Sequence, residues 1–223
     1  MEGTMMSKDS YKIDMCNGPV LPKVIAFSLP LMLSSCLQLL FNAADVIVVG
    51  RFAGSTSLAA VGSTTELLSL LTTLFIGFSI GANVNVARTL GNQDDQGTKD
   101  GIHTAVSVSI LSGSAMILLG FLFGRPMLQW MGTPADVIDK ASLYLMIIFI
   151  GMPSNMAYNF GSAILRAMGD TKRPLYFLSA AGVLNVVLNL IFVIVLHMDV
   201  AGVALASILS ETLRAVLILN CLC

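Results

Sequence analysis

The chain has 223 residues, of which 56% are hydrophobic and 11% are charged, and its formal net charge is −1. Soluble domains carry about 25% charged residues, so this composition excludes an ordinary soluble protein and predicts a protein embedded in a lipid bilayer. The lysines and arginines are scattered and form no basic patch, which excludes a nucleic-acid partner.

Residues 1–19 form a polar segment ahead of the first apolar run. They contain Lys8, Asp9, Lys12 and Asp14 and lack the short apolar core and small-residue cleavage site of a signal peptide. We expect them to form a cytoplasmic N-terminal tail. Residues 20–223 are expected to form one membrane domain.

Apolar runs follow one another along residues 20–223. Five of them are free of charge and long enough to cross a hydrocarbon core, which needs about 20 apolar residues; they are 26–44, 67–87, 104–124, 141–165 and 174–196. A sixth run, 200–223, is equally apolar at both ends but carries Glu211 and Arg214 near its middle. The predicted fold class is an all-α membrane protein with six transmembrane helices.

The lysines and arginines around these runs are distributed unevenly between the two sides of the membrane. Eight lie on the side of the N-terminus, namely Lys8, Lys12, Lys23, Arg88, Lys99, Arg166, Lys172 and Arg173, and three lie opposite, namely Arg51, Arg125 and Lys140. The positive-inside rule therefore predicts a cytoplasmic N-terminus, and we expect the chain in the plasma membrane. The polar segments 91–101 and 168–174 are predicted to be cytoplasmic loops.

One aspartate, Asp45, lies at the end of the first apolar run. A carboxylate within the bilayer costs about 2.5–3.5 kcal/mol, so an acid at this place is a candidate functional residue. Gln38, Asn42 and Asp45 are spaced by four and three residues and share one helix face. Pro30, fifteen residues before Asp45, is expected to bend this helix.

Two further runs carry matching polar faces. Asn185 and Asn189 are four residues apart in the fifth run, and Ser207 and Glu211 are four apart in the sixth. The alternation of six helices places Asp45, Asn189 and Ser207 at comparable depths, so we expect them to form one polar layer.

The remaining polar residues have two interpretations. Gln38, Asn42 and Glu211 are candidates for the lining of a substrate cavity. Hydrogen bonding between helices explains Asn42 as well, and it also explains Asn155 and Asn159. An ion pair with Arg214, three residues further on, explains Glu211 equally well.

Motifs of enzymes and ATP-driven pumps are missing from the sequence. G-F-S-I-G at 77–81 has the spacing of a nucleophile elbow, but that elbow needs a strand-to-helix turn, so we interpret it as a site of close helix packing. No H-E-x-x-H motif or Walker loop is present, and neither an enzyme nor a cofactor is expected. The cysteines lack metal-ligand spacing and are expected to be reduced thiols; they are Cys16, Cys36, Cys221 and Cys223.

A combination of short motifs resembles the N-terminal half of the MATE (multidrug and toxic compound extrusion) transporters. The motifs are D-V-I-V-V-G-R-F, L-A-A-V-G, A-R-T-L-G, A-I-L-R-A-M-G-D-T-K-R-P, N-V-V-L-N-L-I-F and V-A-G-V-A-L-A-S. The resemblance runs from about residue 18 to the end. It implies a fold of two six-helix lobes, of which residues 20–223 supply the first while the second is absent from this chain.

The resemblance also implies a cation site. Asp45 matches the acid of the family's first helix, Asn185 the first asparagine of its fifth-helix motif, and Ser207 the hydroxyl of its sixth helix. Asn189 differs, because many members carry a second acid there. Oxygen ligands of this kind suit a sodium ion, and a lone Asp45 also suits a proton, so both ions stay open; sodium at Asp45 is the one metal ion considered.

The predicted function is secondary active antiport, in which drugs or organic cations are exported in exchange for protons or sodium ions. One alternative is export of lipid-linked saccharides, which a cavity rich in lysine and arginine would favour. Another is a truncated fragment or partner subunit that does not transport. The expected partners are drug-like organic cations, the lipid bilayer, and a second lobe supplied by a separate chain or by a second copy of this one.

Overall fold

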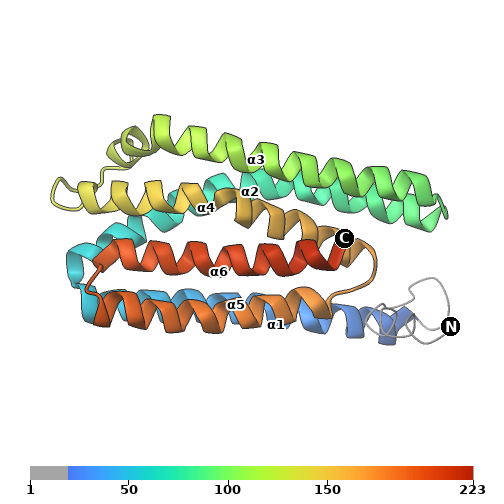
Figure 1. Cartoon of the computed structure of the whole chain (residues 1–223), viewed down its shortest axis with the longest axis horizontal. Coiled ribbons are helices and arrows are strands. Elements are labelled where there is room, and N and C mark those ends of the chain that lie inside the picture. Colours follow the sequence, from blue (N-terminus) through green and yellow to red (C-terminus); the bar gives the residue numbers. More distant parts are fainter. Residues whose placement is uncertain (1–19, 223) are drawn as a thin grey trace.

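The structure is a computed structural model that describes residues 20–222, which form six long helices (Figure 1). They are α1 (Val20–Val48), α2 (Ser55–Gly91), α3 (Asp95–Trp130), α4 (Ile138–Ala167), α5 (Lys172–Leu190) and α6 (Asp199–Leu222). All six are long and apolar enough to span a membrane, which confirms the all-α, multi-pass prediction, including the sixth span. The predicted N-terminal tail, Cys16 and Cys223 lie outside the described residues.

The helices run antiparallel to their chain neighbours, and α4 lies at the centre. It packs against α2, α3 and α6, while α5 packs against α6 and α1. We call the end that carries the α1–α2, α3–α4 and α5–α6 links the distal end. The opposite end, which carries the α2–α3 and α4–α5 links and the end of α6, is the proximal end (Figure 1).

Two short π-helical turns interrupt the regular helices near the distal end. The turn η2 (Val49–Ala53) follows α1 directly, and η3 (Ile191–Val195) follows α5. Sequence periodicity did not predict either turn. Helix α1, in contrast, continues through Pro30 without interruption. The bend expected at this proline therefore does not end the helix.

The proximal links are shorter than the sequence suggested. The predicted loop 91–101 is mostly the first turns of α3, because the Asp94 side chain accepts a hydrogen bond from the backbone N–H of Gly97 (2.9 Å) and caps the helix. The second link does contain a turn, in which Gly169 has a φ of 83° that favours glycine.

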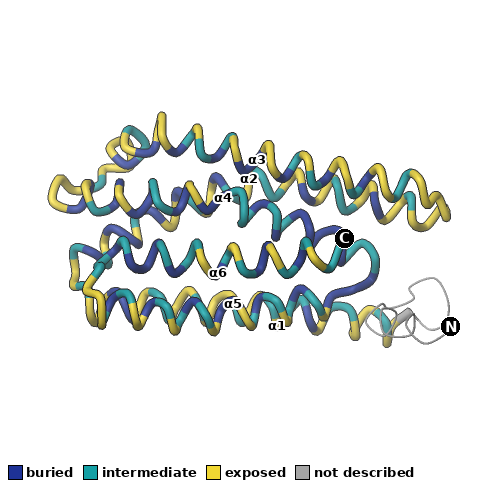
Figure 2. The backbone as a smooth tube through the Cα atoms, viewed as in Figure 1, coloured by how far each residue is buried: buried dark blue, intermediate teal, exposed yellow. Residues whose placement is uncertain are grey.

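The distal half of the bundle holds the main hydrophobic core. Large side chains of several helices meet there and are fully buried, among them Met116, Leu128, Leu145, Phe149 and Met156. The proximal half has two smaller buried clusters instead. Many large apolar residues are exposed, as lipid contact requires. Figure 2 shows exposed residues on the outer sides of the helices.

Glycines permit the close contact between α3 and α4 at the centre of the bundle. A side chain at Gly113 would collide with the backbone of Pro153, and one at Gly120 would collide with the ring of Phe149. The sequence interpretation of G-F-S-I-G was wrong within this chain, because a Cβ at Gly77 or Gly81 would meet nothing within 4 Å. Both glycines lie on an exposed face of α2.

Candidate functional site

A polar pocket of about 130 Å³ lies between α1, α4, α5 and α6. Ionisable, amide and hydroxyl groups form most of its wall, in an otherwise apolar bundle. The polar lining residues are Gln38, Asn42, Asp45, Asn155, Asn185, Ser207, Ser210, Glu211 and Arg214. The pocket therefore contains all the candidate site residues that the sequence indicated except Asn189, which donates a hydrogen bond to Asp45, and Pro30.

A chain of hydrogen bonds connects α1, α5 and α6 at this pocket. Asn189, which is fully buried, donates from Nδ2 to Asp45 Oδ1 (2.5 Å) and to Asn185 Oδ1 (3.2 Å). Asn185 in turn donates to the hydroxyl of Ser210 (3.4 Å). Because Asn185 and Asn189 are four residues apart, one face of α5 presents both amides to the two neighbouring helices.

The hydroxyl on α6 that takes part is a different one from the hydroxyl that the sequence suggested. Ser207 lines the pocket, but its Oγ donates to the backbone oxygen of Val203 (3.0 Å) within the same helix. Ser210, three residues further along the same face, accepts the bond from Asn185. Ser210 lies between Ser207 and Glu211 in the sequence, and adding the position three residues after Ser207 to that polar stripe would have included it.

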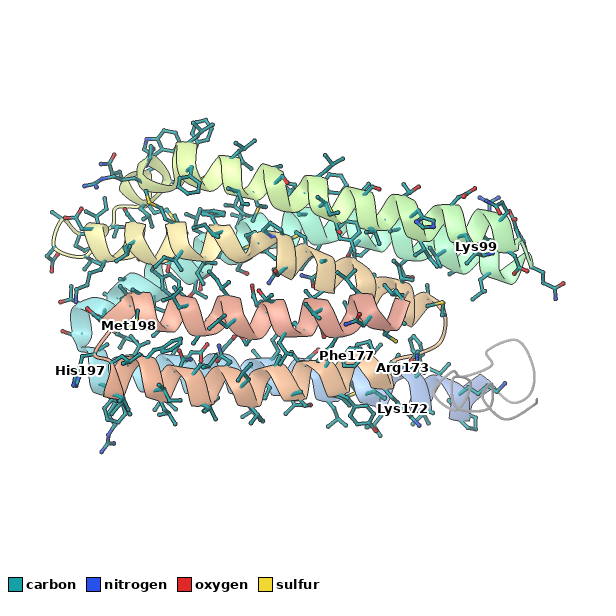
Figure 3. The ribbon with its side chains drawn as sticks, viewed as in Figure 1. Lys99, Lys172, Arg173, Phe177, His197 and Met198 are labelled. Atoms are coloured by element: carbon teal, nitrogen blue, oxygen red, sulfur yellow. The ribbon has the colours of Figure 1, made fainter. Side chains whose placement is uncertain are left out.

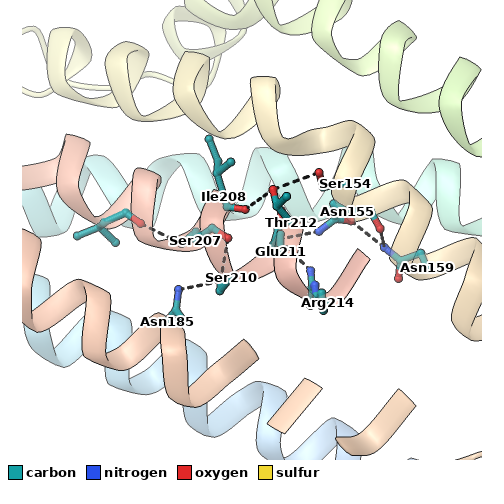
Figure 4. Close-up of polar contacts among 11 residues, drawn as sticks. Ser154, Asn155, Asn159, Asn185, Ser207, Ile208, Ser210, Glu211, Thr212 and Arg214 are labelled. Carbon is teal, nitrogen blue, oxygen red and sulfur yellow. Dashed lines mark hydrogen bonds and ion pairs between the residues drawn. The ribbon is translucent and has the colours of Figure 1, made fainter. Parts of the chain in front are cut away.

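Glu211 takes part in a second network on the α4 side of the pocket. Its Oε1 accepts hydrogen bonds from Arg214 Nη2 (2.9 Å) and from Asn155 Nδ2 (2.7 Å), and Asn159 donates to Asn155 Oδ1 (2.7 Å), as Figure 4 shows. Glu211 forms the expected ion pair with Arg214 and also lines the pocket. Asn155 links α4 to α6, as expected for an interhelical hydrogen bond.

The charges of the pocket leave one unpaired group. Glu211 and Arg214 form an ion pair (2.9 Å) and neutralise each other. Asp45 has no cationic partner among residues 20–222, and its carboxylate accepts a hydrogen bond from the neutral amide of Asn189. Asn189 Oδ1 is buried and has no donor partner among the same residues. The pocket thus offers one carboxylate without a cationic partner, which suits a single positive charge or a proton, and the unpartnered amide oxygen of Asn189 lies buried outside the pocket lining.

The pocket is closed toward the distal end. One helical turn beyond each of Asp45, Asn189 and Ser207 lies a buried valine of the main core, namely Val49, Val193 and Val203. The turns η2 and η3 begin at the same level, so both helices that hold the Asp45–Asn189 bond change their winding next to it. π-helical turns of this kind occur frequently at functional sites.

Toward the proximal end the pocket continues into a larger cavity of about 590 Å³. The two spaces share Gln38, Asn155, Leu178 and Arg214 as lining residues. The pocket and the larger cavity therefore adjoin on the proximal side of Asp45, while the buried valines lie on its distal side.

Comparison with known proteins agrees with this geometry. The family model MatE matches residues 30–191 of the chain. The chain is 34% identical over 202 residues to the probable multidrug resistance protein YpnP of Bacillus subtilis, covering 89% of this chain and 44% of that protein. It is 32% identical over 162 residues to the probable multidrug resistance protein YoeA of the same organism, covering 73% of this chain and 35% of that protein.

A solved structure has the same arrangement of helices. A transporter of the MOP superfamily from Pyrococcus furiosus superimposes with a TM-score of 0.85 at 27% identity, covering 99% of this chain and 48% of that one. The chain thus spans less than half the length of each of these three proteins, and the family resemblance seen in the sequence motifs is confirmed.

The hydrogen-bond chain predicts that substitution of Asn189 and substitution of Asn42 have different effects on stability. Asn189→Ala removes the donor to Asp45 and should cost about 1–3 kcal/mol of stability, because a buried acceptor loses its partner. Asn42→Ala should leave stability unchanged, since Asn42 is exposed and has no side-chain hydrogen bond to another described residue. Thermal unfolding in detergent measures both variants, and equal losses would contradict the assignment.

Proposed function

Because this chain belongs to the MatE family, we propose that it forms one lobe of a secondary active exporter, which expels drug-like organic cations in exchange for protons or sodium ions. The observation that carries the proposal is the carboxylate of Asp45, which has no cationic partner among residues 20–222 and lies in a polar pocket between a buried valine layer and a larger cavity. The names of the two Bacillus relatives, both probable multidrug resistance proteins, support the choice of cargo.

The exchange follows from the charge of the pocket. One negative charge, on Asp45, can be neutralised by a proton, by a metal cation or by an organic cation, but not by two of them at once. A coupling ion that occupies Asp45 therefore disfavours the organic cation, and its release restores the carboxylate. For Asp45 to become accessible from the other side of the membrane, the helices that hold Asp45 and Asn189 must rearrange. The turns η2 and η3 lie next to these two residues.

The proposed coupling ion is the proton. Asn189 turns its amide nitrogen, and not its oxygen, toward Asp45, so a sodium ion held by both residues would require the amide to rotate. No group of three or more His, Cys, Asp or Glu residues lies together within residues 20–222. A single carboxylate is enough for exchange of one proton.

The second lobe of the exporter is proposed to come from a second copy of this chain or from a separate chain. The chain matches 44% of the length of the Bacillus protein YpnP, and six helices leave the polar pocket bordered by α1 on one side, where many side chains are exposed. Drug-like cations, the bilayer and this second lobe are the proposed partners.

The role of Asp45 is tested in a two-lobed protein, made by fusing this chain to the remaining part of YpnP. Asp45→Asn keeps the shape of the side chain but cannot lose or gain a proton, so efflux of a fluorescent organic cation from vesicles should fall to background. Asp95→Asn, which alters an exposed carboxylate at the start of α3, is the matched control and should transport normally. Normal transport by Asp45→Asn would reduce this residue to a structural role.

We propose that the chain lies in the plasma membrane. In the proposed orientation its proximal end and its N-terminus face the cytoplasm. Lys99, Lys172 and Arg173 lie at the proximal end, whereas His197 and Met198 lie at the distal end (Figure 3).

Reporter fusions test this orientation. A reporter fused after Gly91 or Gly169, in the two proximal links, should be active only as a cytoplasmic protein. One fused after Gly54 or Met131, in the distal links, should be active only outside the cell. The reverse pattern would place the proximal cavity on the outside of the cell and overturn the proposed orientation.

A further inference from the structure

The proximal cavity, of about 590 Å³, is larger than the Asp45 pocket and has a different chemistry. Residues of α1, α2, α4, α5 and α6 line it, and it extends from the level of Gln38 to the last turn of α4. No aspartate or glutamate is among its described lining residues, whereas two arginines, Arg166 and Arg214, are.

The two arginines differ in how their charges are balanced. Arg214 is buried, forms an ion pair with Glu211 (2.9 Å) and stacks over the ring of Tyr158, at 4.6 Å from its centroid. Arg166 is half-buried and has no hydrogen bond or ion pair to any residue within 20–222. The cavity therefore contains one positive charge that the described part of the chain does not neutralise.

The sequence analysis placed Arg166 just after the fourth apolar run, on the cytoplasmic side, whereas in the structure it belongs to the last turn of α4, which ends at Ala167. A cation at the end of a helix also offsets the helix dipole, and this alone would explain an arginine there. Arg88, in the last turn of α2 at the same end of the bundle, serves that purpose while fully exposed and outside the cavity. Arg166 differs from it in being half-buried and in lining a cavity.

The walls around Arg166 are of two kinds. The amide of Asn83 lies on α2 and is fixed by a hydrogen bond to the backbone oxygen of Ala163 (2.7 Å). Apolar side chains of α1 and α2, namely Leu31, Ile76 and Ile80, line the same cavity, and Ile80 is also exposed on the outside of the bundle. The space thus joins a charged end to an apolar wall that reaches the lipid-facing surface.

We propose that the proximal cavity binds an amphiphile whose head carries one negative charge on oxygen, a phosphodiester or a carboxylate. Arg166 holds the head, because a guanidinium binds two oxygens of such a group at once. The tail lies along Leu31, Ile76 and Ile80 toward the lipid. A single charge matches the single unbalanced arginine, and a zwitterionic head leaves that charge uncompensated.

This site is separate from the coupling site, because its main residue takes no part in the Asp45 network. Occupancy of the proximal cavity would fill the route by which the Asp45 pocket meets the proximal side. Binding and transport can nevertheless be measured independently, so the result of the binding assay does not depend on whether the antiport proposal is correct.

The test is native mass spectrometry of the purified full chain in a neutral detergent, with four probes: phosphatidylglycerol, phosphatidylcholine with the same acyl chains, oleate, and inorganic phosphate. The wild type should prefer phosphatidylglycerol or oleate to phosphatidylcholine and should not retain inorganic phosphate, which has no tail. Preference for phosphatidylglycerol identifies a phosphodiester head, and preference for oleate identifies a carboxylate.

Variants at the two proximal arginines decide the assignment. Arg166→Gln should weaken binding of the preferred probe about tenfold, the size of one lost charge-assisted contact. Arg166→Lys keeps the charge and should lose less, and it replaces the glutamine variant if that one does not fold. Arg88→Gln should bind like the wild type. Unchanged binding by the Arg166 variants, equal losses at Arg88, or equal retention of phosphatidylcholine by the wild type would each overturn the proposal.

Discussion

The hydrogen bond from Asn189 to Asp45 is the interaction on which the rest of this lobe depends. A carboxylate in an apolar bundle is costly unless its oxygens are satisfied, and here a fully buried amide on another helix satisfies one of them. The same amide reaches Asn185, which reaches Ser210, so three helices are aligned by one chain of contacts. Moving any of these helices changes the surroundings of the carboxylate.

The bundle is asymmetric about this bond, and the asymmetry determines what can reach Asp45. Buried valines seal the distal side one turn away, while the polar pocket continues into the proximal cavity. The two spaces carry opposite unpaired charges, a carboxylate at Asp45 and a guanidinium at Arg166. Between them lies the Glu211–Arg214 ion pair, which is neutral as a unit and adds to neither. The two proposals accordingly assign a cation to the pocket and an anion to the proximal end.

Much of this could be predicted from the sequence, because helix periodicity determines which residues share a face. The six spans and the polar faces of Asp45, Asn185 and Asn189 follow from spacing alone. What spacing cannot provide is the direction of a side chain within its helix. Ser207 satisfies its hydroxyl within its own helix, as serines in apolar helices commonly do, and leaves the contact with Asn185 to Ser210.

The sequence also could not predict which residues of different helices contact one another. The partner of Glu211 on α4, Asn155, is 56 residues away, and no local pattern indicates it. The ends of helices were misjudged for a related reason, since the cap at Asp94 extends α3 into a segment whose polar composition resembles a loop. The end of α4 was misjudged as well, because Arg166 was placed after the fourth apolar run, whereas α4 continues to Ala167 and brings Arg166 to the wall of a cavity.

The central claim is that Asp45 is the group that takes up and releases the coupling ion. Infrared difference spectroscopy of the chain in lipid, recorded on addition of an organic cation such as tetraphenylphosphonium, observes the carboxyl group directly. The account predicts the loss of a protonated-carboxyl band when the cation binds, and no such change in Asp45→Asn. The same difference spectrum in wild type and Asp45→Asn would contradict it.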